Sequence, residues 1–410
     1  MNTPSRSLLL GALVSASLFG CGPGGPGEMT VDALTVSSDI TSPTTWAATA
    51  ADCDVVVTKE IAVKAKLTIA PGVKVCFEAK TGLLVRETGS LSAVGTDTAR
   101  ITLTGTSASP GFWKGVAFLS NDVANSLQYV DLSYAGHPEG FCCGFFNGSE
   151  NSLAALVVGD YQTSALVALS HSRVTQSGAG GVYANENARL TGFADNEFSG
   201  NAGAPVALPL VAVNDLDAAS VYSGGATPNG KNVVRVLAFR KTTTPVTLKR
   251  LDVPYAMSEG TPNKVFEVAA PMTIEAGTRA EFEANSGLLI AANGSLNVNG
   301  TAAARVTLTG RSPTPGYWKG VAVLSLSNAL NNTDLSFAGN DDSFCCGFFN
   351  GQGDAKAGLV VGDTSTTGGV VVTDVAVTQS KNRGVFVVKG SLTEMGTNDL
   401  ATGNALPNIR

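Results

Sequence analysis

The chain has 410 residues, of which 15% are charged and 7% aromatic, and its formal net charge is −6 at pH 7. This length exceeds one small core and suits either two domains or one elongated solenoid. The 47 glycines and the sparse charge are typical of β-rich extracellular proteins. No basic run is present, which excludes the electrostatic footprint of a nucleic-acid binder.

The amino terminus predicts export and lipid anchoring. Arg6 precedes the apolar stretch LLLGALVSASLFG, which ends directly before Cys21. A positive start, a short apolar core and small residues describe a signal peptide, here residues 1–20, that is too short to remain as a membrane-spanning helix. The ending LFGC resembles the lipobox of bacterial lipoproteins, which implies cleavage before Cys21 and acylation of this residue. The alternative is an ordinary secretory signal with a chance cysteine.

Residues 21–50 are expected to form the lipidated start of the mature chain and a flexible tether, because GPGGPGE has no side chains to pack. By analogy with enterobacterial lipoproteins, glycine rather than aspartate at position 22 indicates anchoring in the outer membrane. No later stretch holds eighteen uninterrupted apolar residues, so the membrane partner is expected through the lipid alone.

One long block occurs twice in the chain. The first copy runs from Pro110 to Gly148 and the second from Pro315 to Gly351, and both end in FCCGFFNG. The offset between the copies is 205 at the start of the block and 203 at its end. This internal duplication of about 200 residues predicts a first half over 51–254 and a second half over 255–410.

Six cysteines remain after Cys21, an even number in an oxidising compartment. Cys53 and Cys76 fall where the second copy has Ser258 and Glu281. Two cysteines that are absent together are expected to be bonded to each other. We therefore predict a Cys53–Cys76 disulfide that holds the first turns of the fold, where fraying is easiest.

The other cysteines form two doublets, Cys142-Cys143 and Cys345-Cys346. Within an elongated stack the doublets lie too far apart to bond each other. Each doublet therefore forms a vicinal disulfide, pairs across a dimer or stays reduced. Adjacent α-carbons are only about 3.8 Å apart, which strains a vicinal bond. A metal site is the more specific alternative. No CxxC or HxxxH spacing completes a ligand set, however, so we expect no metal.

From Cys53 onward the chain consists of short apolar runs such as KLTI, LLVRE and RITLTG, separated by Gly, Asn, Asp and Pro. Alternate residues within them are apolar, which is the strand period, and no helical period is sustained beyond the signal peptide. Such strands allow a sandwich, a barrel or a stacked β-helix. The duplication favours the β-helix, because a solenoid lengthens simply by adding turns.

Three phrases carry a family resemblance: IAPGVKVCFEAKTGLLVRETGSLSAVGT, LTGTSASPGFWKGVAF…NSLQYVDLSYAG and LTGRSPTPGYWKGVAV…NNTDLSFAG. They resemble bacterial surface proteins with right-handed parallel β-helix repeats, of the pectin-lyase-like class. The resemblance covers most of residues 61–200 and 265–405. It implies an all-β, single-stranded right-handed parallel β-helix with three sheets around a prism and a rise of about 4.8 Å per turn. Residues 205–250 are expected to add turns that bridge the two copies.

Several aromatic and basic residues recur in both copies and are candidates for binding. Aromatic faces with nearby polar groups suit sugar rings, so the two sets could form equivalent binding patches. The alternative is structural: each tryptophan packs over a sheet corner, and the phenylalanines cover the cysteine doublets instead of standing exposed. The candidates are Trp113, Lys114, Phe145, Phe146, Trp318, Lys319, Phe348 and Phe349.

Catalytic signals are weak. The sequence NTD ending at Asp334, with Asp341 and Asp342, superficially resembles a polygalacturonase carboxylate set, but the other motifs of that family are missing. His137 and His171 have no counterpart in the second copy, so a histidine-dependent triad has no support. We therefore expect no catalytic residue and no cofactor.

The leading expectation is a non-catalytic outer-membrane lipoprotein, either surface-exposed or periplasm-facing, that acts as a scaffold or adhesin and binds glycans or partner proteins. The alternative is a polysaccharide lyase or glycoside hydrolase of the β-helix class. Charged side chains that converge in one groove would favour the enzyme. Scattered charges beside an aromatic ledge would favour binding.

Overall fold

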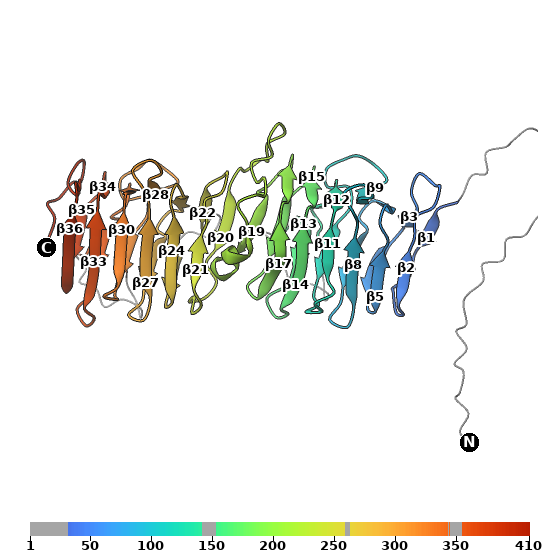
Figure 1. The fold of residues 1–410 in the computed structure, drawn as a ribbon, viewed down its shortest axis with the longest axis horizontal. Coiled ribbons are helices and arrows are strands. Elements are labelled where there is room, and N and C mark those ends of the chain that lie inside the picture. The colour runs from blue at the N-terminus through green and yellow to red at the C-terminus, as the bar shows by residue number, and fades with distance from the viewer. Residues whose placement is uncertain (1–31, 142–152, 259–262, 343, 345–354) are drawn as a thin grey trace, which may run out of the picture.

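The computed structural model describes residues 32–141, 153–258, 263–342, 344 and 355–410. Within these residues, short parallel strands coil into one elongated stack, and Figure 1 shows them side by side from the blue amino-terminal end to the red carboxyl-terminal end. The predicted all-β parallel β-helix is therefore confirmed. The described residues contain one helix, the 3₁₀ helix η2 (Leu210–Asp215), which the sequence patterns did not predict. No described helix has the length and apolar character needed to cross a membrane.

Five parallel sheets make up the walls of the solenoid. Sheet I contains β1 (Leu34–Val36), β3 (Val55–Val57), β6 (Lys74–Phe77), β9 (Ile101–Gly105), β12 (Val130–Ser133), β15 (Arg173–Thr175) and β18 (Glu197–Ser199). Sheet II contains β4 (Glu60–Val63), β7 (Gly82–Val85), β10 (Gly115–Phe118), β13 (Ala154–Val158), β16 (Gly180–Ala184), β19 (Val206–Pro209), β20 (Val234–Leu237), β22 (Tyr255–Met257), β25 (Arg279–Phe282), β28 (Val306–Gly310), β31 (Thr333–Ser336) and β34 (Ala376–Thr378). Sheet III contains β2 (Thr44–Trp46), β5 (Lys66–Ile69), β8 (Ser90–Val94), β11 (Ser126–Gln128), β14 (Ala165–Ser170) and β17 (Ala188–Ala194).

The last two sheets belong to the second half of the chain. Sheet IV contains β23 (Val265–Val268), β26 (Gly287–Ile290), β29 (Gly320–Val323), β32 (Ala357–Val361) and β35 (Arg383–Val387). Sheet V contains β21 (Val246–Leu248), β24 (Pro271–Glu275), β27 (Ser295–Asn299), β30 (Asn328–Asn331), β33 (Gly368–Thr373) and β36 (Gly390–Met395).

The twelve-stranded sheet II joins strands that hold different positions in the two copies. The first-half strands of this sheet include β7, β10, β13 and β16. Strands β19, β20 and β22 come next, and β25, β28, β31 and β34 follow them. By the sequence offset, β25 corresponds to β6 and β28 to β9, both of which lie in sheet I. The stacking therefore shifts by one sheet where the halves meet. Helix η2 lies at this shift and contacts both β17 and β21 (Figure 1).

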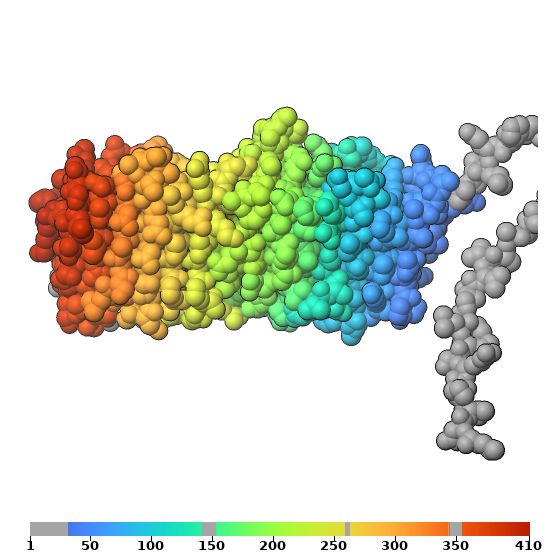
Figure 2. Space-filling view, viewed as in Figure 1, coloured from blue at the N-terminus to red at the C-terminus, as the bar shows by residue number. Residues whose placement is uncertain are grey.

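One apolar core extends through both halves, from Val36 in the first strand to Leu400 near the carboxyl terminus. It forms because the apolar residues alternate: in β14, for example, every second side chain is buried and the others are half-buried. Strands β19 to β22 belong to the same stack, so residues 205–250 form turns, as predicted. Figure 2 shows the resulting rod-shaped molecule.

Buried asparagines close equivalent corners in the two copies. The side-chain oxygen of Asn125 accepts a hydrogen bond from the Leu91 N–H at 3.1 Å, and that of Asn328 accepts one from the Leu296 N–H at 2.9 Å. Both amides are fully or almost fully buried and donate to backbone carbonyls in return. These side chains satisfy backbone groups that the corner removes from the sheet ladder.

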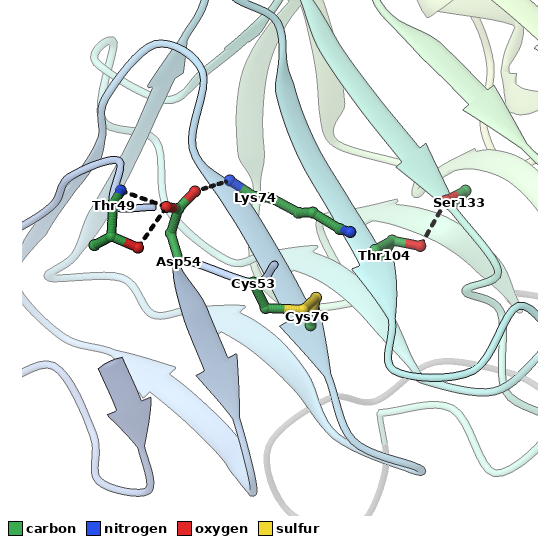
Figure 3. Close-up of a disulfide and its surroundings, with 7 residues drawn as sticks. All are labelled: Thr49, Cys53, Asp54, Lys74, Cys76, Thr104 and Ser133. Atoms are coloured by element: carbon green, nitrogen blue, oxygen red, sulfur yellow. Dashed lines mark hydrogen bonds between the residues drawn. A yellow bond between two sulfur atoms is a disulfide. The ribbon is translucent and has the colours of Figure 1, made fainter. Parts of the chain in front are cut away.

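The amino-terminal end is held by a disulfide and a carboxylate network (Figure 3). Cys53 and Cys76 are bonded, with α-carbons 5.8 Å apart, so the predicted pairing is confirmed. Beside them, Asp54 accepts hydrogen bonds from the Lys74 N–H at 2.7 Å and the Thr49 hydroxyl at 2.8 Å. Burial would raise the pKa of Asp54, but these hydrogen bonds outweigh it and the pKa lies below its usual 3.8.

The last turn is capped by the carboxyl-terminal segment. Isolated parallel bridges join Asp399 to β34, and Leu406 and Ile409 to β35. This partial turn covers the edges of two sheets, and edge strands left open invite pairing with other chains. The sequence alone did not show what supplies this cap.

Candidate functional site

The two repeated tryptophans lie in the core. Trp113 stacks on Phe77 with ring centroids 3.9 Å apart, and Trp318 stacks on Phe282 at 4.1 Å. Both indole side chains are 0% exposed. Trp113 donates its ring N–H to the Ser133 carbonyl, and Trp318 donates its ring N–H to the equivalent Ser336 carbonyl. The tryptophans therefore offer no aromatic face at the surface for a sugar ring. Both have the structural role, packing inside the fold, that was the alternative to binding.

The lysines that follow them have diverged in their contacts. The Lys114 ammonium lies 2.7 Å from the Glu60 carboxylate and 6.0 Å from the centroid of the Phe141 ring. In the second copy Val265 occupies the position of Glu60, and the Lys319 ammonium donates to the carbonyl of Asp342 at 3.0 Å. Burial lowers the pKa of Lys319, although the nearby Asp342 carboxylate opposes this effect.

The first phenylalanine of each FCCGFFNG motif covers the outside of a sheet. Phe141 packs on outward-facing apolar side chains of sheet II, and Phe344 packs on those of sheet IV. A glycine makes room for each ring, because a Cβ at Gly82 would lie 2.8 Å from Phe141 and one at Gly287 would lie 2.7 Å from Phe344. Both phenylalanines are buried, a structural role that the list of binding candidates did not include.

Several candidates lie outside the described residues. These are the lipidation site Cys21, the doublets Cys142, Cys143, Cys345 and Cys346, and the motif residues Phe145, Phe146, Phe348 and Phe349.

A row of alternating charges crosses sheet I. Asp131 on β12 lies opposite Arg173 on β15, which lies opposite Glu197 on β18. The Arg173 guanidinium is 3.7 Å from the Asp131 carboxylate and 3.4 Å from that of Glu197. Arg100 binds Asp131 from the other side through Nε and Nη2, with distances of 2.8 to 3.0 Å. Each charge in the row thus faces an opposite one.

A stack of rings lies at the corner next to this row. Tyr129 and His171 are stacked at 4.7 Å, and the Arg100 guanidinium lies 5.7 Å from the Tyr129 ring centroid. The His171 ring nitrogen Nδ1 is 3.7 Å from a carboxylate oxygen of Asp195. Tyr129, His171 and Asp195 all have positive φ angles, between 49° and 53°, so each projects from the same kind of sharp corner.

Arg100, the Arg173 and Glu197 members of the charge row and the ring stack line a shallow groove of about 290 Å³, which we call the sheet I groove. Asp131 pairs with two of these residues but does not itself line the groove. Its described walls supply hydrogen-bond donors, acceptors and the edges of two aromatic rings. The groove also receives Asn196 and Val221 from the following turn. It can hold a polar ligand by hydrogen bonds to several groups at once.

The second copy has no such groove by sequence. Tyr129 is replaced by Asn332, His171 by Asp374 and Arg173 by Ala376. Sequence reasoning gave weight to residues that repeat, and His171 lacked a counterpart, so the groove was missed. The available signal was a tyrosine one residue before the strand VDLS and a histidine two residues before the strand RVT.

Two of the three carboxylates that resembled a polygalacturonase set are each held by a cation of their own. Arg305 binds Asp334 through two nitrogens, at 2.7 and 3.0 Å, and Lys381 pairs with Asp341. Among the described residues, no group of three or more His, Cys, Asp or Glu side chains could hold a metal ion.

Comparison with known proteins finds no matching family model, no matching curated protein and no matching solved structure. The chemistry of the groove is therefore the basis for a functional assignment.

Proposed function

We propose that the protein is an exported, lipid-anchored outer-membrane scaffold or adhesin that binds glycans without transforming them. The observation that carries this proposal is the sheet I groove, in which a ring stack lies beside a row of mutually paired charges. The groove lies on an elongated rod with one continuous core, which is a suitable support for presenting a binding face.

The groove suits a hydroxyl-rich ligand. The Arg173 and Glu197 side chains are 52% and 45% exposed, so a donor and an acceptor of opposite charge both face solvent. Hydroxyl groups both donate and accept hydrogen bonds, so a sugar can satisfy both kinds of group together. A volume of about 290 Å³ is at the lower end for ligand sites and fits one short part of a longer chain.

The paired charges are the reason to favour binding over catalysis. A glycosidase needs one carboxylic acid to donate a proton and one carboxylate to act as nucleophile or base. Here Asp131 is bound by Arg100 and Glu197 lies 3.4 Å from Arg173, so each of these carboxylates is engaged by a guanidinium of the protein itself. The convergence of several charged residues in one groove is the observation that favours the alternative, a polysaccharide lyase or glycoside hydrolase.

A glycan array followed by titration of the best ligand tests the proposal. The test variant is Tyr129→Asn, which introduces the second-half residue at a corner where asparagine tolerates the positive φ. The matched control is the reciprocal change Asn332→Tyr. We expect Tyr129→Asn to weaken glycan binding about tenfold and the control to leave it unchanged. Equal effects of both variants, or released products from any polysaccharide, would overturn the proposal.

The anchoring part of the proposal has its own test. Cys21→Ala should remove fatty-acid labelling of the mature protein and move it from the membrane fraction to the soluble fraction. A variant that remains acylated and membrane-bound would contradict lipid anchoring at Cys21.

A further inference from the structure

A larger cavity, of about 670 Å³, lies where the two halves of the chain meet, and we call it the junction pocket. One wall is formed by residues 238–241 after β20. The other is formed by residues 263–265 and Glu267 at β23, together with Lys319 just before β29 and Asp342. This is the region in which the stacking shifts by one sheet, so two turns fail to follow each other continuously. The principal lining residues are Phe239, Arg240, Lys241, Lys264, Glu267 and Lys319.

The junction pocket carries excess positive charge. Four cationic side chains line it, against the two carboxylates of Glu267 and Asp342. Lys241 is paired with Glu267 at 2.6 Å, whereas Arg240 reaches Glu186 outside the pocket lining. With Glu186 counted, the described residues place four cations against three carboxylates, so an anion that enters the pocket still meets a net attraction, which is strongest away from bulk water.

The equivalent position in the first half lacks this excess. Lys59 and Lys114 correspond to Lys264 and Lys319, but Glu60 lies beside Lys114, where the second half has Val265. Arg240 comes from the junction segment, which is not part of the duplicated block. The two sites thus share a framework and differ in charge, and the first half provides an internal control.

The lining residues also indicate that the ligand is more than a simple anion. Glu267 and Asp342 supply acceptors, and the exposed Asn263 adds an amide, so the pocket can accept hydrogen bonds as well as donate them. Inorganic phosphate offers these carboxylates few hydrogen-bond donors. A sugar ring with one carboxylate satisfies both conditions, and Phe239 provides an apolar surface for the ring.

We propose that the junction pocket binds a sugar acid, with its carboxylate facing Arg240 and Lys264 and its hydroxyl groups facing Glu267 and Asp342. This site is separate from the sheet I groove, and its occupancy does not depend on Tyr129 or His171. A volume of about 670 Å³ is within the usual range for small-molecule sites.

Calorimetric titration with glucuronate and with glucose tests the proposal, because the two differ only in a carboxylate replacing a hydroxymethyl group. We expect saturable glucuronate binding, at least about tenfold weaker glucose binding, and a glucuronate affinity that falls as salt is added. Lys264→Ala should weaken glucuronate binding about tenfold, and Lys59→Ala, its exposed first-half counterpart, should not. Arg240→Ala provides a second test if the Lys264 variant loses its fold.

Absence of saturable glucuronate binding would overturn the proposal. So would equal affinity for glucose, or an equal loss in the Lys264 and Lys59 variants. Inorganic phosphate bound as tightly as glucuronate would identify a general anion site and refute the sugar-acid assignment. Tyr129→Asn should leave glucuronate binding intact, so failure here is distinguishable from failure of the glycan proposal.

Discussion

Removal of the Cys53–Cys76 disulfide should destabilise the amino-terminal turns and little else. The perturbation is the double change Cys53→Ala and Cys76→Ala, which avoids leaving one unpaired thiol. Among the described strands β1 pairs with β3 alone, so within this part of the chain the first turn has a neighbour on one side only. In a solenoid each turn contacts mainly its neighbours, and a lost constraint therefore acts locally.

The magnitude follows from the size of the loop that the disulfide closes. The two cysteines are separated by 23 positions in the sequence. For a loop of this length, the chain-entropy estimate gives about 3 kcal/mol of stabilisation relative to the open chain. That free energy corresponds to a factor of ~100 in the equilibrium between closed and open forms of these turns.

Hydrogen exchange measured by mass spectrometry is the appropriate assay, because it reports local opening segment by segment. Amides of β3 and β6 should exchange ~100-fold faster in the double variant, whereas those of β26 to β31 should keep their rates. The second half, which has no such disulfide, is the internal control. Unchanged exchange in β3 and β6, or equal acceleration along the whole chain, would refute the reasoning.

Three further changes test other parts of the structure. Trp318→Ala should destabilise the second half by about 3–5 kcal/mol in denaturant unfolding, because it removes a buried ring stacked on Phe282; a loss below about 1 kcal/mol would contradict the packing. Gly82→Ala places a Cβ 2.8 Å from the Phe141 ring and 2.9 Å from a backbone carbonyl. We therefore expect about 1–3 kcal/mol of destabilisation in the same measurement. A neutral result would show that Phe141 packs elsewhere. Asp54→Asn should destabilise the protein at pH 7, and the gap to the wild type should close as the pH falls from 3.8 through the lower folded-state pKa. A gap that widens in acid would reverse the assigned direction of the Asp54 shift.

Much of the fold could be predicted from the sequence, because it depends on local patterns. Alternating apolar residues, as in β14, define strands, and a long duplication favours a stack that adds turns. The Cys53–Cys76 pair was found by its joint absence from the second copy, which is a property of two positions rather than of one. Helix η2 was missed because LVAVND is short and apolar, and periodicity cannot separate such a run from a strand.

The shift between the halves could not be predicted in the same way. Matching segments imply matching positions within each copy, but they do not fix how one copy stacks on the other. The structure places β25, the equivalent of a sheet I strand, in sheet II. Strands β19, β20 and β22, which lie outside the duplicated block, come between the two sets of strands in this sheet, and the junction pocket adjoins the segment after β20.

The duplication also gives a criterion for separating structural residues from functional candidates. Trp113 and Trp318 are identical in the two halves and both are fully buried, so the core requires them. Packing tolerates little change in volume, so both copies are constrained alike at these positions. Surface positions have no such constraint, and there Tyr129 differs from Asn332 and Glu60 from Val265. Repetition of buried residues therefore marks the framework, whereas divergence between otherwise equivalent surfaces indicates where each half can have acquired its own ligand.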